Sequence, residues 1–247
     1  MTEFAERDLV GASFDRVDFS RSTFRSCDFT GVVMRGVDLI DMDIHADVEN
    51  LVINGVDVAP LISAELDRRQ PGRAKMRPTD PAGFLEGYDL VMGLWEETVA
   101  RARRLDPARL HESVDGEWSF VETLRHLAFA TDSWVGRAIQ ADPSPWDPLD
   151  LPWDEMPDTP GVPRDRDVRP SLDEVLALRR DRTDRVRRYL ADLTDEELDR
   201  ETDEHDSPGW PQRSFPVRQC LLIVLNEEWE HRLYAERDLD ALVARGD

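Results

Sequence analysis

The chain has 247 residues, with 53 acidic and 31 basic side chains and a formal net charge of −22. At roughly 100–200 residues per domain, this length predicts one or two domains, and the negative charge, which no local basic patch offsets, excludes a nucleic-acid partner. No run of about 18 apolar residues and no charged-then-apolar leader occurs, so we expect no membrane span, no secretory signal and a cytoplasmic location.

The first fifty residues repeat every five positions. Large apolar residues recur in unbroken register at Phe4, Leu9, Phe14, Phe19, Phe24, Phe29, Met34, Leu39 and Ile44. Neither an α-helix nor a β-strand has this period, since theirs are 3.6 and 2. A short fixed repeat predicts a solenoid, in which four pentapeptides form one square coil with the apolar residues inward and parallel β-type hydrogen bonds join successive coils.

Residues 2–48 resemble the pentapeptide-repeat family, whose fold is a right-handed quadrilateral β-helix. The match is looser at Thr2, Arg7 and Met42. Some long members are acidic rods that mimic DNA, and residues 1–60 hold 12 acidic and 5 basic side chains. However, nine repeats make little more than two coils, a stack about 11 Å tall, or about a third of one DNA turn. We therefore expect residues 1–60 to form a small structural cap or a dimerisation edge.

Residues 61–80 predict a linker, because they are mostly polar and contain Pro71, Gly72 and Pro78. Beyond them the apolar residues follow the helical period. Proline follows Asp80 at the start of the first helix, and a Ser-x-x-Glu capping box opens each of the next two. The predicted helices begin at Pro81, Ser119, Ser171 and Phe215, with the second reaching Gln140 and the fourth Ala244. The pattern predicts a four-helix bundle over residues 81–247.

The predicted connection between the second and third helices is long and rich in proline. Residues 142–170 contain eight of the sixteen prolines, so they cannot form a helix. Apolar residues predict that the loop packs onto the bundle: Trp146, Leu149, Leu151, Trp153 and Met156. Long loops in compact domains are usually functional or disordered. Two interpretations stand, a lid or pocket wall and a structural crossover.

A carboxylate and an imidazole interrupt an apolar stripe of the fourth helix. The stripe contains Cys220, Ile223, Val224, Glu227, His231 and Tyr234, at spacings of three and four. Burial of an unpaired carboxylate is costly, so a metal, an arginine or a proton shared with the histidine must offset it. Glu227 and His231 are four residues apart and point the same way, as paired metal ligands on a helix do.

His126, in the second predicted helix, is the candidate for a third ligand. The strongest apolar stripe of that helix contains Leu124, Ala128, Thr131 and Val135. His126 lies on another face, near Phe129 and Glu122. The periodicity therefore turns His126 toward the fourth helix only if the second helix is buried on two sides.

Two motifs are similar to the DinB-like metal-binding superfamily. They are Gly116 to Ser119 with the following residues to Leu127, and the segment NEEWEHRLYAERDL at 226–239. Members are four-helix bundles that bind a metal through the second and fourth helices, many with three histidines. The resemblance covers residues 80–245 and implies that His126, Glu227 and His231 are the ligands. Their His–Glu–His set is similar to that of the mycothiol-dependent maleylpyruvate isomerase branch.

Three protein ligands leave positions open for water or substrate, which is typical of a catalytic site. Two imidazoles and a carboxylate suit zinc, nickel, manganese or iron, of which zinc and nickel are the first choices. The resemblance implies a low-molecular-weight thiol, with mycothiol the first to try. Tyr234 is the candidate for a catalytic hydrogen-bond donor, and Arg232 and Arg237 are candidates to meet an acidic substrate.

We therefore expect a metal-dependent thiol S-transferase or related hydrolase that acts on a small molecule. The alternative is a non-catalytic module, with a structural or vestigial metal site and a solenoid that mediates homodimer formation.

Overall fold

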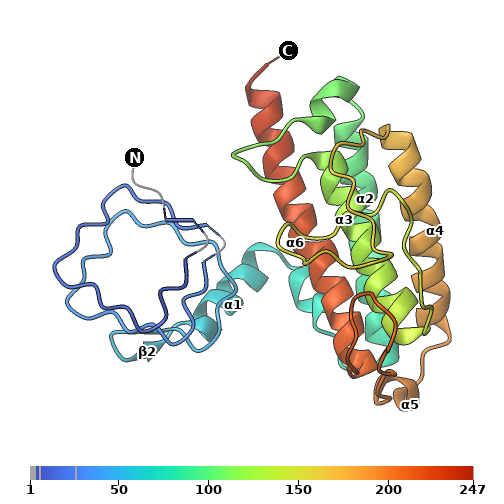
Figure 1. Ribbon diagram of the computed structural model, residues 1–247, viewed down its shortest axis with the longest axis horizontal. Helices are drawn as coiled ribbons and strands as arrows, with labels where there is room; N and C mark the ends of the chain where they lie inside the picture. The colour runs from blue at the N-terminus through green and yellow to red at the C-terminus, as the bar shows by residue number, and fades with distance from the viewer. Residues whose placement is uncertain (1–3, 6, 26, 247) are drawn as a thin grey trace. The chain divides into compact units, whose positions relative to one another are not determined.

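The computed structural model describes residues 4–5, 7–25 and 27–246. The chain is mainly helical and divides into two compact units, Met1–Val48 and Glu49–Asp247 (Figure 1). Across the described ranges, no helix combines the length and the apolar character that a bilayer crossing needs.

The backbone of the first unit bends every five residues. The φ angle is positive at Gly11, Arg16, Arg21, Gly31, Gly36 and Asp41. A backbone hydrogen bond closes a tight turn once every ten residues. The first of these bonds joins Ala12 N to Leu9 O over 2.9 Å. Figure 1 shows this chain winding through successive coils. The five-residue period of the sequence is thus also a period of the backbone.

The hydrogen bonding of this unit differs from the expected solenoid. Among its described residues the backbone hydrogen bonds close turns, and none joins one coil to the next as a strand ladder. The physical reason is the bend at each repeat, which leaves straight runs shorter than an ordinary strand. Successive phenylalanine rings from Phe14 to Phe29 contact each other, with centroids 5.5–5.8 Å apart. They nevertheless stay about half exposed, with Phe19 at 44%, because so short a stack covers each ring incompletely.

The second unit opens with a hairpin and a helix. Strands β1 (Val52–Ile53) and β2 (Val56–Asp57) pair antiparallel around Asn54 and Gly55, which both have positive φ, as a two-residue hairpin turn requires. Helix α1 (Ala59–Arg69) and the 3₁₀ turn η1 (Arg73–Met76) follow. The polar segment expected to be a linker therefore contains ordered helical structure.

Four long helical segments carry the core of this unit. They are α2 (Pro81–Ala102), α3 (Phe120–Thr131) with its π-helical continuation η3 (Asp132–Ile139), α4 (Leu172–Ala191) and α6 (Val217–Ala244). Helix α2 packs against α4 and α6, and α3 packs against the same two helices (Figure 1). The shorter η2 (Pro107–His111) and α5 (Asp195–Leu198) lie in the connections.

The predicted helix starts are confirmed by their caps. The Asp80 side chain accepts a hydrogen bond from Gly83 N, and both capping boxes, at Ser119 and Ser171, are complete. Helix α6 begins two residues later than expected, because Pro216 is its N-cap. The segment from 119 to 140 is helical throughout, but it changes from α to π geometry at Asp132.

Helix α3 is buried almost all the way round, with eleven of its twelve residues buried. Helices α4 and α6 cover one side, and the Pro-rich loop 142–170 covers another. Arg125 Nε donates to Leu149 O at 2.7 Å, and Leu151 N donates to Arg125 O at 3.3 Å. Leu151 and Met156 are buried. The loop therefore packs down, as its apolar residues predict.

Candidate metal centre

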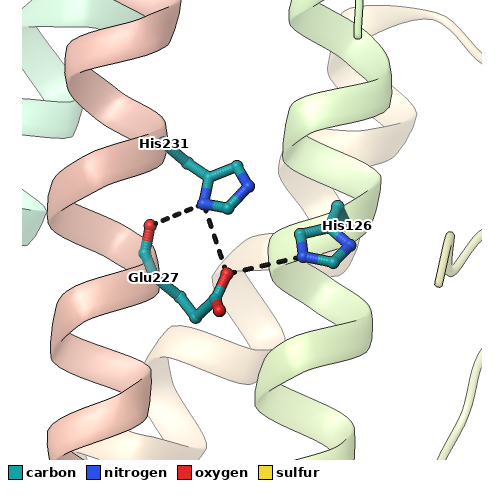
Figure 2. Close-up of side chains that lie close together, drawn as sticks. All are labelled: His126, Glu227 and His231. Carbon is teal, nitrogen blue, oxygen red and sulfur yellow. Dashed lines mark hydrogen bonds and ion pairs between the residues drawn. The ribbon is translucent and has the colours of Figure 1, made fainter. Parts of the chain in front are cut away.

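Three side chains from two helices converge at one point. His126 comes from α3, and Glu227 and His231 come from successive turns of α6 (Figure 2). Glu227 Oε2 lies 3.4 Å from His126 Nε2 and 3.2 Å from His231 Nδ1. One nitrogen or oxygen atom from each residue falls within 4.8 Å of the others. The sequence motifs that were separated by about a hundred residues thus meet in space.

His126 is oriented by the Pro-rich loop. Its Nδ1 lies 3.0 Å from Leu151 O, and a carbonyl oxygen can only accept, so Nδ1 carries the hydrogen. If the ring is neutral, its lone pair is then on Nε2, the atom that faces Glu227. A metal-ligating histidine usually makes such a bond with its second ring nitrogen. Only 8% of the His126 side chain is exposed.

His231 is held by its own helix. Its Nδ1 lies 3.0 Å from the carbonyl oxygen of Glu227, one turn earlier. Burial and the neighbouring His126 lower the pKa of His231 to about 4. The imidazole is therefore neutral at pH 7, the form that binds metals. Figure 2 shows its other ring nitrogen pointing away from α6.

One oxygen of the Glu227 carboxylate lacks a hydrogen bond. Its Oε2 atom is buried and has no hydrogen-bond partner among the described residues. Burial acts to raise the pKa of Glu227, yet the two imidazoles hold the pKa below its ordinary value. Glu227 Oε2 lies 3.4 Å from His126 Nε2, and if His126 Nδ1 donates to Leu151 O in a neutral ring, both of these atoms are acceptors. Two acceptors in this arrangement need a cation or an extra proton between them, and the donor set fits a divalent metal.

Aromatic rings enclose the three side chains. The Trp118 ring lies 4.4 Å from His126 and stacks on His231 at 5.9 Å, centroid to centroid. Its Nε1 donates to Asp154 of the Pro-rich loop at 3.2 Å. Trp118 therefore joins the Pro-rich loop to both imidazoles of the centre. Its place directly before the N-cap of α3 is the only local signal, and it does not reveal contact with α6.

The other predicted residues lie differently. Tyr234 is 43% exposed, and its ring lies 5.9 Å from that of His231. Arg237 stacks on Tyr234 and pairs with Asp238, whereas Arg232 stacks on the buried Trp229. Tyr234 alone of these three has a ring contact with a candidate ligand among the contacts described. The two ligands from α6 are the more exposed, with 28% of the Glu227 side chain and 18% of the His231 side chain accessible to solvent.

Two surface hollows, of about 580 and 610 Å³, lie away from the centre. The first is bordered by α4 and α5, and the second by the exposed face of α2. Neither is lined by the candidate ligands or by the Pro-rich loop.

Comparison with known proteins agrees with both family resemblances. The family model described as DinB superfamily matches residues 93–235, and the model described as pentapeptide repeats matches residues 3–41 in eight copies. A search of curated proteins finds no significant match, and neither does a search of solved structures. The first match spans more than half of the chain and includes all three candidate ligands. The chain belongs to the DinB superfamily, with pentapeptide repeats at its N-terminus.

Proposed function

We propose that His126, Glu227 and His231 bind one divalent metal in a DinB-like four-helix bundle, and that the bundle is a metal-dependent thiol S-transferase. We further propose that the first unit is a short pentapeptide solenoid. One observation carries the metal site: one potential ligand atom from each of His126, Glu227 and His231 lies within 4.8 Å of the others, and the buried Glu227 Oε2 has no hydrogen-bond partner among the described residues. The family membership supports it.

The residues around the centre are already in the states that this function needs. Glu227 is ionised and His231 is neutral at pH 7, so neither must lose a proton before it can bind a cation. A bound divalent cation supplies a Lewis acid that lowers the pKa of a thiol. In an S-transfer step the thiol would give its proton to solvent, and its sulfur would form a bond to an electrophilic carbon as that carbon's bond to a leaving group breaks and the leaving group departs with the bonding electron pair. Trp118 provides an aromatic wall beside this position, and Tyr234 is the candidate donor to the substrate.

Metal binding is tested first, on protein purified without a histidine tag. Elemental analysis should find about one equivalent of zinc or nickel in the wild-type chain, and titration of the chelator-treated protein should saturate at the same ratio. Loss of a ligand should weaken binding by more than the roughly 10–100-fold that outer-shell changes cost. The variants are His126→Ala and Glu227→Gln, with the exposed His45→Ala as the matched control.

A wild-type chain that stays metal-free under these conditions would contradict the proposal. His126 and Glu227 would then form a structural ion pair, with a proton on His126 in place of the metal. His126→Ala should in that case lower stability without changing metal content.

Catalysis is tested separately, by thiol consumption with a panel of small electrophiles. Mycothiol is the first thiol to try, and glutathione and cysteine are the comparisons. Activity should be lost on chelation and recovered on adding back the metal. A loaded protein that consumes no thiol would favour the alternative, a non-catalytic module.

That alternative has one observation in its favour. Apolar side chains of the first unit lie open to solvent, with Val10 95% and Ile40 77% exposed. Exposed apolar patches mark interaction surfaces. If the unit mediates homodimer formation, removing residues 1–48 should convert a dimer into a monomer in light scattering.

A further inference from the structure

Glu228 follows the candidate ligand Glu227 in α6, but its side chain contacts a different helix. It is buried, and both of its carboxylate oxygens accept from one guanidinium group. Arg179 of α4 donates from Nη1 to Oε1 and from Nη2 to Oε2, each over 2.8 Å. Trp95 of α2 donates from Nε1 to the backbone oxygen of Glu228 over 3.1 Å. Both α2 and α4 are therefore hydrogen-bonded to α6 at Glu228.

The Arg179–Glu228 pair is enclosed by the core. Arg179 is 6% exposed, and its Cζ lies 5.6 Å from the centroid of the buried Trp95 ring. Apolar residues of similar volume often stabilise a protein as well as such a pair does, because two charges must be taken out of water. What the pair adds is direction, since the fork of a guanidinium fits a carboxylate in one geometry.

The apolar residues of α6 do not fix the rotation of the helix by themselves. The six residues from Cys220 to Leu225 are all apolar, and at about 100° per residue they cover every side of the helix. Apolar burial is not directional. The two hydrogen bonds of Glu228, in contrast, form at one rotation of the helix, and this rotation also sets the direction of Glu227 one residue earlier.

A small rotation of α6 would spoil the metal centre. A helix with its side chains is about 10–12 Å in diameter, so ligand atoms lie about 5 Å from the axis and a 10° rotation moves them by about 0.9 Å. A metal site must hold its ligands within about 0.5 Å of the productive geometry. His126 is oriented separately, by the carbonyl oxygen of Leu151. The two ligands on α6 therefore need a device that fixes their own helix.

We propose that the buried Arg179–Glu228 pair fixes the rotation of α6 and so holds Glu227 and His231 against His126. The inference rests on the proposed metal site. It makes Arg179 and Glu228 positioning residues, which touch neither metal nor substrate and act on the centre through the helix that carries its ligands.

The test uses the full-length double variant Arg179→Met/Glu228→Leu. The change removes one positive and one negative charge, so the net charge near the centre is kept, and its apolar side chains should keep the Tm of the metal-free protein close to that of wild type. Zn²⁺ affinity, measured by competition with a chromophoric chelator, should nevertheless fall about 10–100-fold. The absorption spectrum of the Co²⁺-loaded protein, which reports ligand geometry, should change as well.

The matched control makes the same exchange at an exposed ion pair between α4 and α2. Arg187 and Asp89 lie 2.8 Å apart there, and Arg187→Met/Asp89→Leu should change neither the Zn²⁺ affinity nor the Co²⁺ spectrum. Loss of affinity at an unchanged Tm separates positioning of the ligands from a general loss of folding.

A second variant covers the case in which the double variant does not fold. Arg179→Lys keeps the charge but not the bidentate geometry, and it should lose at least about threefold in Zn²⁺ affinity. Wild-type affinity with an unchanged Co²⁺ spectrum in the double variant, or in Arg179→Lys where the double variant does not fold, would overturn the inference and leave the metal site standing. A wild-type protein that binds neither ion would overturn the proposed function as well.

Discussion

Replacing Glu227 with glutamine removes the charge of the candidate centre and keeps the length of the side chain. The carboxylate oxygen lies 3.2 Å from His231 Nδ1 and 3.4 Å from His126 Nε2, so the amide meets the same neighbours. A metal that binds only the folded state raises the free energy of unfolding by about 2.7 kcal/mol when its free concentration is a hundred times Kd, and by about 4.1 kcal/mol at a thousand times Kd. For a unit of about 200 residues, each kcal/mol raises Tm by about 2–4 °C.

Wild-type protein should therefore gain about 5–16 °C in Tm at those excesses, and Glu227→Gln should gain less than about 2 °C. The assay is thermal unfolding followed by circular dichroism, first with chelator and then with increasing Zn²⁺ or Ni²⁺. Glu196→Gln, at an exposed position of α5, is the control and should behave as wild type. An equal gain in Glu227→Gln would refute the reasoning, because the stabilising ion would then bind elsewhere.

Three further predictions concern the surroundings of the centre. The Trp118 ring lies 4.4 Å from that of His126, so Ni²⁺ bound at the centre should quench tryptophan fluorescence. Trp118→Phe should remove most of this quenching while metal still binds. Undiminished quenching in the variant would assign the effect to another tryptophan. Asp150 of the Pro-rich loop is completely buried, and burial raises its pKa from the ordinary 3.8 to about 9. The contribution of Asp150 to the free energy of unfolding is thus fully present below about pH 4. It is lost as pH rises toward 9, by up to about 1.4 kcal/mol per pH unit. Urea unfolding should show this slope in wild type and a flatter one in Asp150→Asn; parallel slopes would contradict the assignment. Arg179 and Glu228 form a buried bidentate ion pair with both hydrogen bonds at 2.8 Å. Arg179→Met should therefore lower the free energy of unfolding by about 3–5 kcal/mol, and the added change Glu228→Leu should recover most of that loss. An Arg179→Met variant within about 1 kcal/mol of wild type would show that water solvates the remaining Glu228 carboxylate.

Features that depend on near neighbours in the chain were predictable. Each capping box joins residues three apart, so Ser119 and Ser171 marked helix starts that the structure confirms. The five-residue period of the N-terminus returns as positive φ angles at the same interval. Glu227 and His231 share a face because one helical turn separates them, whatever surrounds the helix.

The third side chain of the centre depended on the tertiary structure. His126 lies off the main apolar stripe of its helix, so the period alone left its direction open. That face is interior because residues 142–170 fold back over it and place Leu151 O on the His126 ring. The contacts of Trp118 with both imidazoles and the complete burial of Asp150 arise in the same way.

The helices, the repeat and the pair on α6 were predictable from the residues alone, because each depends on local spacing. The direction of the third imidazole and the burial of Asp150 required the packing of the whole unit. Both features depend on which segments, about twenty to a hundred residues apart in the chain, pack against each other and exclude water. Burial and the fields of neighbouring charges act through space, and no local pattern of residues records them.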